Sequence, residues 1–257
     1  MSLVAITQKE LADLVREKRF GGWALVFLAF WMLFLFFFIS NLDARGSFGT
    51  SSVPMLLEPA YFFYAIGFAV LALFVLTDGI TKERESGMLP VVAAKPIVRW
   101  HIVLAKLLTG VVVYVASYVV TLAPALVLTA AIGLPALEML TLFYLGPFLA
   151  LYVFLLGVGL LLGVVTSSSK VAIGTAAGLL LPLFLFMGDG PLSLLYGRYP
   201  FLRDVASYTP FQAGYDAAQV LVHGGQMPWG PLLVTAGIGG VCALAAFWAF
   251  SRQEVAA

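Results

Sequence analysis

The chain has 257 residues, of which 62% are hydrophobic and only 11% are charged, and its formal net charge is +1. So apolar a composition excludes a soluble domain of this length and predicts an integral membrane protein. Nucleic-acid-binding proteins concentrate Lys and Arg on one face, and the near-neutral charge predicts no nucleic acid partner. The single cysteine, Cys242, provides neither a disulfide framework nor a thiolate metal site.

The first 22 residues predict an interfacial amphipathic helix. Leu11, Leu14 and Val15 recur with Val4 at helical spacing, while charged residues occupy other positions around the helix. We expect this segment to lie against membrane lipid before the chain turns inward at residues 21–22. Two interpretations are open: a topological anchor, or a lever that contacts the same partner as the charged loop described below.

Six charge-free apolar runs follow, and about 20 such residues suffice to cross a bilayer as a helix. They cover residues 23–40, 59–77, 107–132, 139–166, 171–188 and 229–250. The runs are continuous and do not alternate, which predicts helices rather than barrel strands. We therefore expect an all-α integral membrane bundle of six transmembrane helices, forming one domain over residues 1–257.

Small residues four positions apart recur in the last three runs. The pairs are Gly159 with Gly163, Gly174 with Gly178, and Ala236 with Gly240. Such pairs let helices approach closely, and we expect them to mark helix–helix packing. A bundle that changes conformation also uses such residues, and the sequence does not separate the two roles.

The distribution of Lys and Arg predicts that both termini are cytoplasmic. In that orientation only Arg45, Arg198 and Arg203 of the 14 basic residues lie outside. Lys and Arg are enriched on the cytoplasmic side of membrane proteins, and an even number of spans places both ends on the same side. We expect a multi-pass protein of the cell membrane.

Residues 79–106 form the largest charged loop, between the second and third runs on the cytoplasmic side. The second helix is expected to continue beyond the membrane until Gly87 stops it. A short, partly apolar helix then fits residues 89–95, and Pro96 ends it because its ring disfavours helix in the preceding residue. A loop of this kind is suited to coupling the membrane domain mechanically to a cytoplasmic partner.

The loop sequence E-R-E-S-G-M-L-P-V-V-A-A-K-P-I-V-R-W-H-I-V-L-A-K resembles the loop between spans two and three of type 2 ABC transporter permeases. The residues that match the family pattern are Glu83, Arg84, Glu85, Gly87, Leu89, Pro96, Arg99 and Lys106. Met88 stands where the family usually has a small residue, and Pro90 where it usually has Glu or Leu. The resemblance extends across nearly the whole chain and implies an interfacial N-terminal helix, six spans and both ends inside.

The resemblance also implies that the short helix is a coupling helix that fits a groove on a cytoplasmic ABC ATPase. Its coupling residues would be the matching residues together with Met88. The chain has no G-x-x-x-x-G-K-[ST] phosphate loop, so ATP and magnesium would be bound by a separate ATPase chain, and no cofactor is expected here. For Glu83, Arg84 and Glu85 the alternative is an ordinary solvated helix end, whose ion pairs contribute little stability.

Residues 189–228 form the predicted outer loop between the last two spans. Thr209 can cap a helix that has Pro210 at its first position and that ends at Gly224-Gly225. The resemblance implies short helices that are partly inserted into the membrane here. A folded outer loop is the alternative.

No enzyme motif stands out, since the chain has neither an H-E-x-x-H nor a G-x-S-x-G pattern. We therefore expect no catalytic and no metal-binding residues. The resemblance implies the permease subunit of an ATP-driven ABC transporter, more typically an exporter, paired with a second copy or a related permease. An ion-coupled secondary transporter or channel subunit is the main alternative, and a membrane scaffold for a cytoplasmic protein is another. The substrate stays open.

Overall fold

The computed structural model describes residues 3–16, 21–22, 25, 29, 32–33, 36, 67, 76–77, 79–87, 100–131, 137–185, 194–223 and 225–252. Within these residues the backbone forms eight α-helices and no strand. The helices are α1 (Leu3–Arg16), α4 (Gly79–Glu85), α6 (Trp100–Ala131), α7 (Leu137–Val165), α8 (Ser169–Leu185), α9 (Phe201–Ser207), α10 (Pro210–His223) and α11 (Trp229–Arg252). The predicted all-α class is confirmed for this part of the chain.

Three of the described helices, α6, α7 and α11, are long and apolar enough to cross a membrane. They agree with the third, fourth and sixth predicted spans. The fifth corresponds to α8, which is apolar but has 17 residues. The first two predicted spans, 23–40 and 59–77, lie almost wholly outside the described residues, so the number of six stays a prediction.

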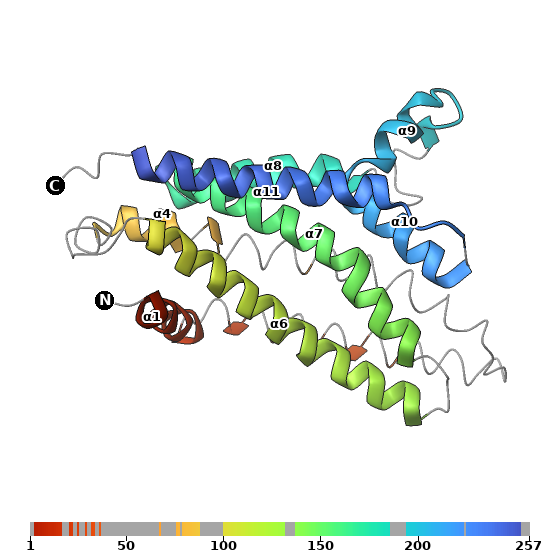
Figure 1. The fold of residues 1–257 in the computed structure, drawn as a ribbon, viewed down its shortest axis with the longest axis horizontal. Coiled ribbons are helices and arrows are strands. Elements are labelled where there is room, and N and C mark those ends of the chain that lie inside the picture. The colour runs from red at the N-terminus through yellow and green to blue at the C-terminus, as the bar shows by residue number, and fades with distance from the viewer. Residues whose placement is uncertain are drawn as a thin grey trace.

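Helix α7 is the centre of the bundle, with α6 on one side and α11 on the other (Figure 1). Its side chains Phe148, Leu160 and Val164 are fully buried. Against α11, Gly157 and Gly239 bring the two backbones into direct contact, because a Cβ atom on Gly157 would overlap the Gly239 carbonyl. Small residues permit such close crossings of apolar helices.

Helices α6 and α7 are joined by two tyrosines. The rings of Tyr114 and Tyr152 stack with their centroids 4.0 Å apart. The Tyr152 hydroxyl donates a hydrogen bond of 2.7 Å to the carbonyl oxygen of Gly110 in α6. A buried hydroxyl in an apolar helix needs such a partner, and this one ties the two helices together.

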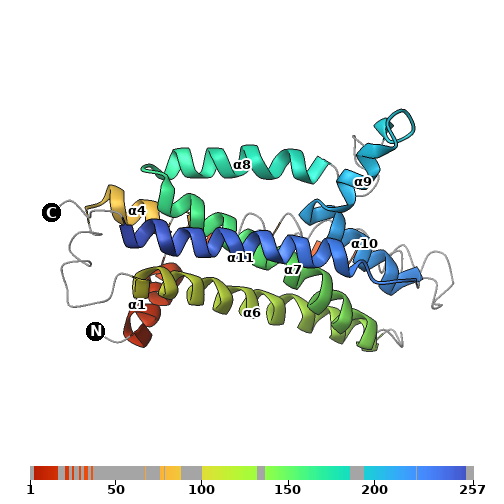
Figure 2. The ribbon, with the colours of Figure 1, turned by 45° about the horizontal axis from the view of Figure 1, so that its top comes forward.

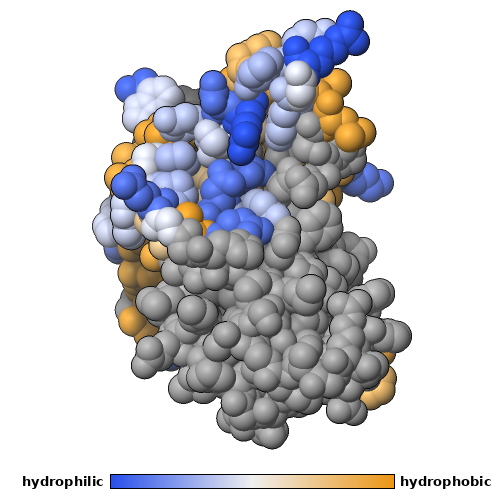
Figure 3. Space-filling model, turned by 90° about the vertical axis from the view of Figure 1, so that its right-hand side faces the viewer, coloured by the Kyte–Doolittle hydropathy of each residue, from blue (hydrophilic) through white to orange (hydrophobic). Residues whose placement is uncertain are grey.

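The two ends of the bundle differ in the elements they carry (Figures 1 and 2). Helices α1 and α4 and the C-terminal end of α11 lie at one end, whereas α9 and α10 lie at the other. Viewed from the α9 and α10 end, hydrophilic residues gather beside exposed apolar ones (Figure 3). Arg198, Arg203 and Asp204 are exposed there, close in sequence to exposed Phe201 and Val205.

Helix α10 begins at Pro210 and ends at His223, as the sequence predicts. The Thr209 hydroxyl does not face this helix but donates a 2.7 Å hydrogen bond to the carbonyl of Ala206 in α9. Ala213 and Ala217 of α10 are fully buried and pack with Ala150 of α7 and Leu232 of α11. The helix therefore lies against the bundle.

Candidate functional site

The candidate site is α4 together with the helix ends that surround it. Gly87 lies just beyond α4 with a φ of 70°, a left-handed conformation that glycine adopts without strain. Its N–H donates to the Arg84 carbonyl at 3.1 Å, and the Ser86 N–H donates to the Lys82 carbonyl at 2.9 Å. The prediction that Gly87 terminates this helix is confirmed.

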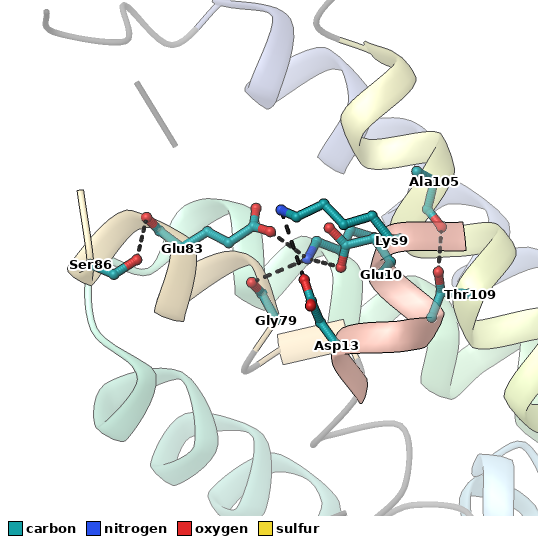
Figure 4. Close-up of polar contacts among 9 residues, drawn as sticks. Lys9, Glu10, Asp13, Gly79, Glu83, Ser86, Ala105 and Thr109 are labelled. Carbon is teal, nitrogen blue, oxygen red and sulfur yellow. Dashed lines mark hydrogen bonds and ion pairs between the residues drawn. The ribbon is translucent and has the colours of Figure 1, made fainter. Parts of the chain in front are cut away.

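Glu83 of α4 forms one side of a three-residue ion cluster (Figure 4). The Lys106 Nζ atom of α6 lies 3.1 Å from the Glu83 carboxylate and also pairs with the carboxylate of Glu10 in α1. The side chains of Lys106, Glu10 and Glu83 are 4%, 12% and 18% exposed. A buried ammonium is tolerated when it is paired and hydrogen-bonded, so the cluster joins α1, α4 and α6.

Glu10 is the unusual member of this cluster. Burial raises the pKa of the Glu10 carboxyl, and the nearby charge of Glu83 raises it further, while Lys106 acts in the opposite direction. The carboxylates of Glu10 and Glu83 therefore share the Lys106 ammonium in a partly desolvated site. The Glu10 carboxyl is therefore shifted toward its protonated form relative to a carboxyl in water.

Arg84 points from α4 to the end of α7. Its guanidinium donates a 2.9 Å hydrogen bond to the Val164 carbonyl and another to the Thr166 carbonyl. Carbonyls in the last turn of a helix have no partner within the helix and carry partial negative charge. A guanidinium is suited to this position because its forked donors reach two acceptors at once.

Glu85 points to the beginning of α8. Its carboxylate accepts a 2.8 Å hydrogen bond from the backbone N–H of Ser169, the first residue of α8. This bond, with a side-chain hydrogen bond from Ser168 and the charge of Lys170, lowers the pKa of the Glu85 carboxyl. The first N–H groups of a helix lack intrahelical partners, and a carboxylate satisfies them as an N-cap residue would.

Comparison with known families covers nearly the whole chain. A family model described as "ABC-2 family transporter protein" matches residues 4–255. The chain belongs to the ABC-2 transporter family. ABC-2 permeases are the membrane component of ABC transporters and associate with ABC ATPase subunits, so this permease is a membrane protein and is not itself the catalytic subunit. Comparison with individually curated proteins finds no match.

Several predicted coupling residues of the permease lie outside the described part of the chain. These are Met88, Leu89, Pro96 and Arg99. The short transverse helix they were expected to form therefore stays a prediction. Those that are described, namely Glu83, Arg84, Glu85, Gly87 and Lys106, come together at α4 and the adjoining end of α6.

In α1 of the permease, the predicted apolar residues do not share one environment. Leu11 and Leu14 are half-buried, whereas Val15 is 77% exposed. The buried residue is Ile6, and α1 packs against α6. The position of α1 at the membrane surface stays a prediction.

Sequence reasoning missed Glu10 as a site residue of the permease. A signal was present, because Ile6, Glu10 and Leu14 are four residues apart and share one helical face. A carboxylate on an otherwise apolar face points to a buried partner. The partners of Arg84 and Glu85 gave no such signal, since both residues bind main-chain atoms.

The described residues of the permease contain no group of three or more His, Cys, Asp or Glu side chains that could hold a metal ion. Glu10 and Glu83 are two carboxylates, and Lys106 lies against both. An ammonium at that place occupies the oxygen atoms that a cation would need. The arrangement is suited to holding helices together.

Proposed function

We propose that this chain is the membrane-spanning permease subunit of an ATP-driven ABC exporter, coupled to a separate cytoplasmic ATPase through residues 79–106. In this proposal the chain has six spans and both termini in the cytoplasm. It pairs with a second copy or a related permease, and the partner ATPase binds ATP and magnesium. Support comes from the family match over residues 4–255, which includes the whole charged loop.

The contacts of α4 are the observation that carries the coupling role. Helix α4 is the first part of the loop, and its side chains are bonded to α6, the end of α7 and the beginning of α8. Lys106 of α6, which pairs with Glu83 of α4, also pairs with Glu10 of α1. A displacement of residues 88–99 that moves α4 would be transmitted to these helices through the side chains of α4. Two ATPase subunits closing on ATP beneath two permeases would supply that displacement.

The contacts of α10 support partial insertion of residues 189–228. Ala213 and Ala217 pack against Ala150, which lies 13 residues into α7. At 1.5 Å per residue, that is about 20 Å along the helix from Leu137. A helix that packs this far along a span would enter the outer leaflet.

Purification of the full chain from its native membrane in mild detergent tests the coupling role. We expect a protein with a phosphate loop to co-purify with it. Leu89→Asp should lower the co-purified amount about ten-fold or more, which corresponds to losing at least ~1.4 kcal/mol of binding free energy. Leu194→Asp is the matched control, because Leu194 is 85% exposed and lies before α9 at the other end of the bundle.

A preparation with no nucleotide-binding partner, even after crosslinking, would contradict the proposal. Transport in proton- or sodium-loaded vesicles without ATP would then favour an ion-coupled transporter. Equal co-purification with Leu89→Asp and Leu194→Asp would place the ATPase contact elsewhere on the permease.

A further inference from the structure

Glu83, Arg84 and Glu85 are consecutive residues whose side chains bond to three different parts of the molecule. Successive residues of a helix point about 100° apart, so three in a row face three directions. Glu83 bonds to Lys106 of α6, Arg84 to the end of α7, and Glu85 to the start of α8. All three partners belong to the membrane subunit itself.

The junction between α4 and α7 is also close along the backbone. A Cβ atom added to Gly163 would lie 2.8 Å from the Leu76 carbonyl oxygen and 3.3 Å from that of Thr77. The buried Thr77 hydroxyl donates a 3.2 Å hydrogen bond to the Gly159 carbonyl of α7. Leu76, Thr77 and Arg84 thus all contact α7, which limits sliding between the two segments.

Only residues 166–168 separate α7 from α8, and we refer to them as the α7–α8 turn. On one side of this turn, Arg84 donates hydrogen bonds to the carbonyl oxygens of Val164 and Thr166. On the other side, Glu85 accepts a hydrogen bond from the backbone N–H of Ser169. Adjacent residues of α4 therefore bind a C-terminal carbonyl of α7, the Thr166 carbonyl of the turn and an N-terminal amide of α8.

We propose that Arg84 and Glu85 are positioning residues that fix the α7–α8 turn to α4 and make no contact with the ATPase. Displacement of the 79–106 loop then moves α7 and α8 together with α4. This inference rests on the proposed coupling function. It assigns these two residues a different role from Met88 and Leu89, which would face the ATPase.

A distance measurement on the full chain tests whether Arg84 and Glu85 hold the turn. Spin labels are placed through Ser86→Cys and Ser167→Cys in a Cys242→Ser background, since both serines are exposed. In lipid nanodiscs we expect one narrow distance distribution, which is lost when Arg84→Gln and Glu85→Gln are combined. Arg84→Lys should broaden it in part, because an ammonium does not have the forked donors of a guanidinium.

Arg252→Gln is the matched control for this measurement. Arg252 is a cation at the same end of the bundle, with its guanidinium 4.3 Å from the Trp248 ring centroid. Its replacement should leave the distribution unchanged. A distribution that stays narrow in the Arg84→Gln and Glu85→Gln variant would overturn the inference.

A second readout tests transmission in the complex with the co-purified ATPase. Lys170→Cys places a single exposed thiol in the first turn of α8, just outside the predicted fifth span, in the Cys242→Ser background. We expect ATP, magnesium and vanadate to change its maleimide labelling rate, and we expect Arg84→Gln to abolish this change while ATPase co-purification stays at the unsubstituted level. Lower co-purification with Arg84→Gln would instead place Arg84 in the ATPase contact and overturn the inference.

The outcomes separate the two proposals. An ATPase that co-purifies, with a labelling change that persists in Arg84→Gln, contradicts the role of the α7–α8 turn and leaves the coupling function intact. A chain without any ATPase contradicts the coupling function, and with it the transmission. The spin-label distances still decide whether Arg84 and Glu85 hold the turn.

Discussion

At the residue scale, Lys106 is the most constrained charge among the described residues that form ion pairs. It matches the family pattern as the last residue of the charged loop, and the sequence alone places it at a membrane surface. Its side chain is instead nearly enclosed, between Glu83 of α4 and Glu10 of α1. Both carboxylates are themselves mostly buried and share Lys106 as their cation. Removal of Lys106 and removal of Glu10 should therefore have unequal effects.

We expect Lys106→Met to destabilise the chain by about 3 kcal/mol or more, because two buried carboxylates would face each other without a cation. Glu10→Gln should change stability little, since the amide still accepts a hydrogen bond and Glu83 still pairs with Lys106. Folding raises the pKa of Glu10, so its contribution to stability falls as pH rises above its ordinary value of 4.5. Thermal unfolding in detergent at pH 7 compares the two variants, and equal midpoints would contradict this order.

At the element scale, the sequence predicted the helices better than their contacts. Long apolar runs locate α6, α7 and α11, and Pro210 locates the start of α10. Which glycines touch was not predictable, because it depends on the angle at which two helices cross. A Cβ atom on Gly163 meets the Leu76 backbone as expected, whereas no described residue lies within 4 Å of such an atom on Gly174 or Gly178.

The crossing of α7 and α11 rests on a pair that spacing did not reveal, Gly157 and Gly239. Gly157→Ala should destabilise the chain by roughly 1–3 kcal/mol, because an added methyl group would force the two backbones apart. Gly174→Ala is the control: no described residue lies close to the added methyl group and helix propensity rises, so its unfolding midpoint should not fall. Equal unfolding midpoints for Gly157→Ala and the control would show that α7 and α11 accommodate the methyl group without a loss of stability.

At the scale of the whole molecule, helix α1 and the first part of the charged loop meet at one end. Helix α1, helix α4 and the last turn of α11 are all there, while α9 and α10 are at the opposite end (Figure 1). Charge distribution in the sequence was sufficient to predict that these elements share a side. It could not predict that α1 and α4 are joined through Lys106, because that contact links positions 96 residues apart.

Labelling with a membrane-impermeant maleimide tests the orientation in a Cys242→Ser background. In intact cells Leu194→Cys should react, whereas Ser86→Cys and Ser251→Cys should react only after permeabilisation. All three positions are exposed, so access depends on the side of the membrane. Reaction of Ser86→Cys in intact cells would reverse the proposed topology.

Arg84 and Glu85 form hydrogen bonds with main-chain atoms, and this affects which positions of the protein can change during evolution. Every residue has a backbone carbonyl, and every residue except proline has a backbone N–H. Positions 164, 166 and 169 can therefore mutate without losing these hydrogen bonds. The side chains of α7 and α8 can therefore change while the attachment of these helices to α4 is kept. Correlated mutation between position 84 and the turn is not expected, and a search for coevolving pairs would pass over this contact.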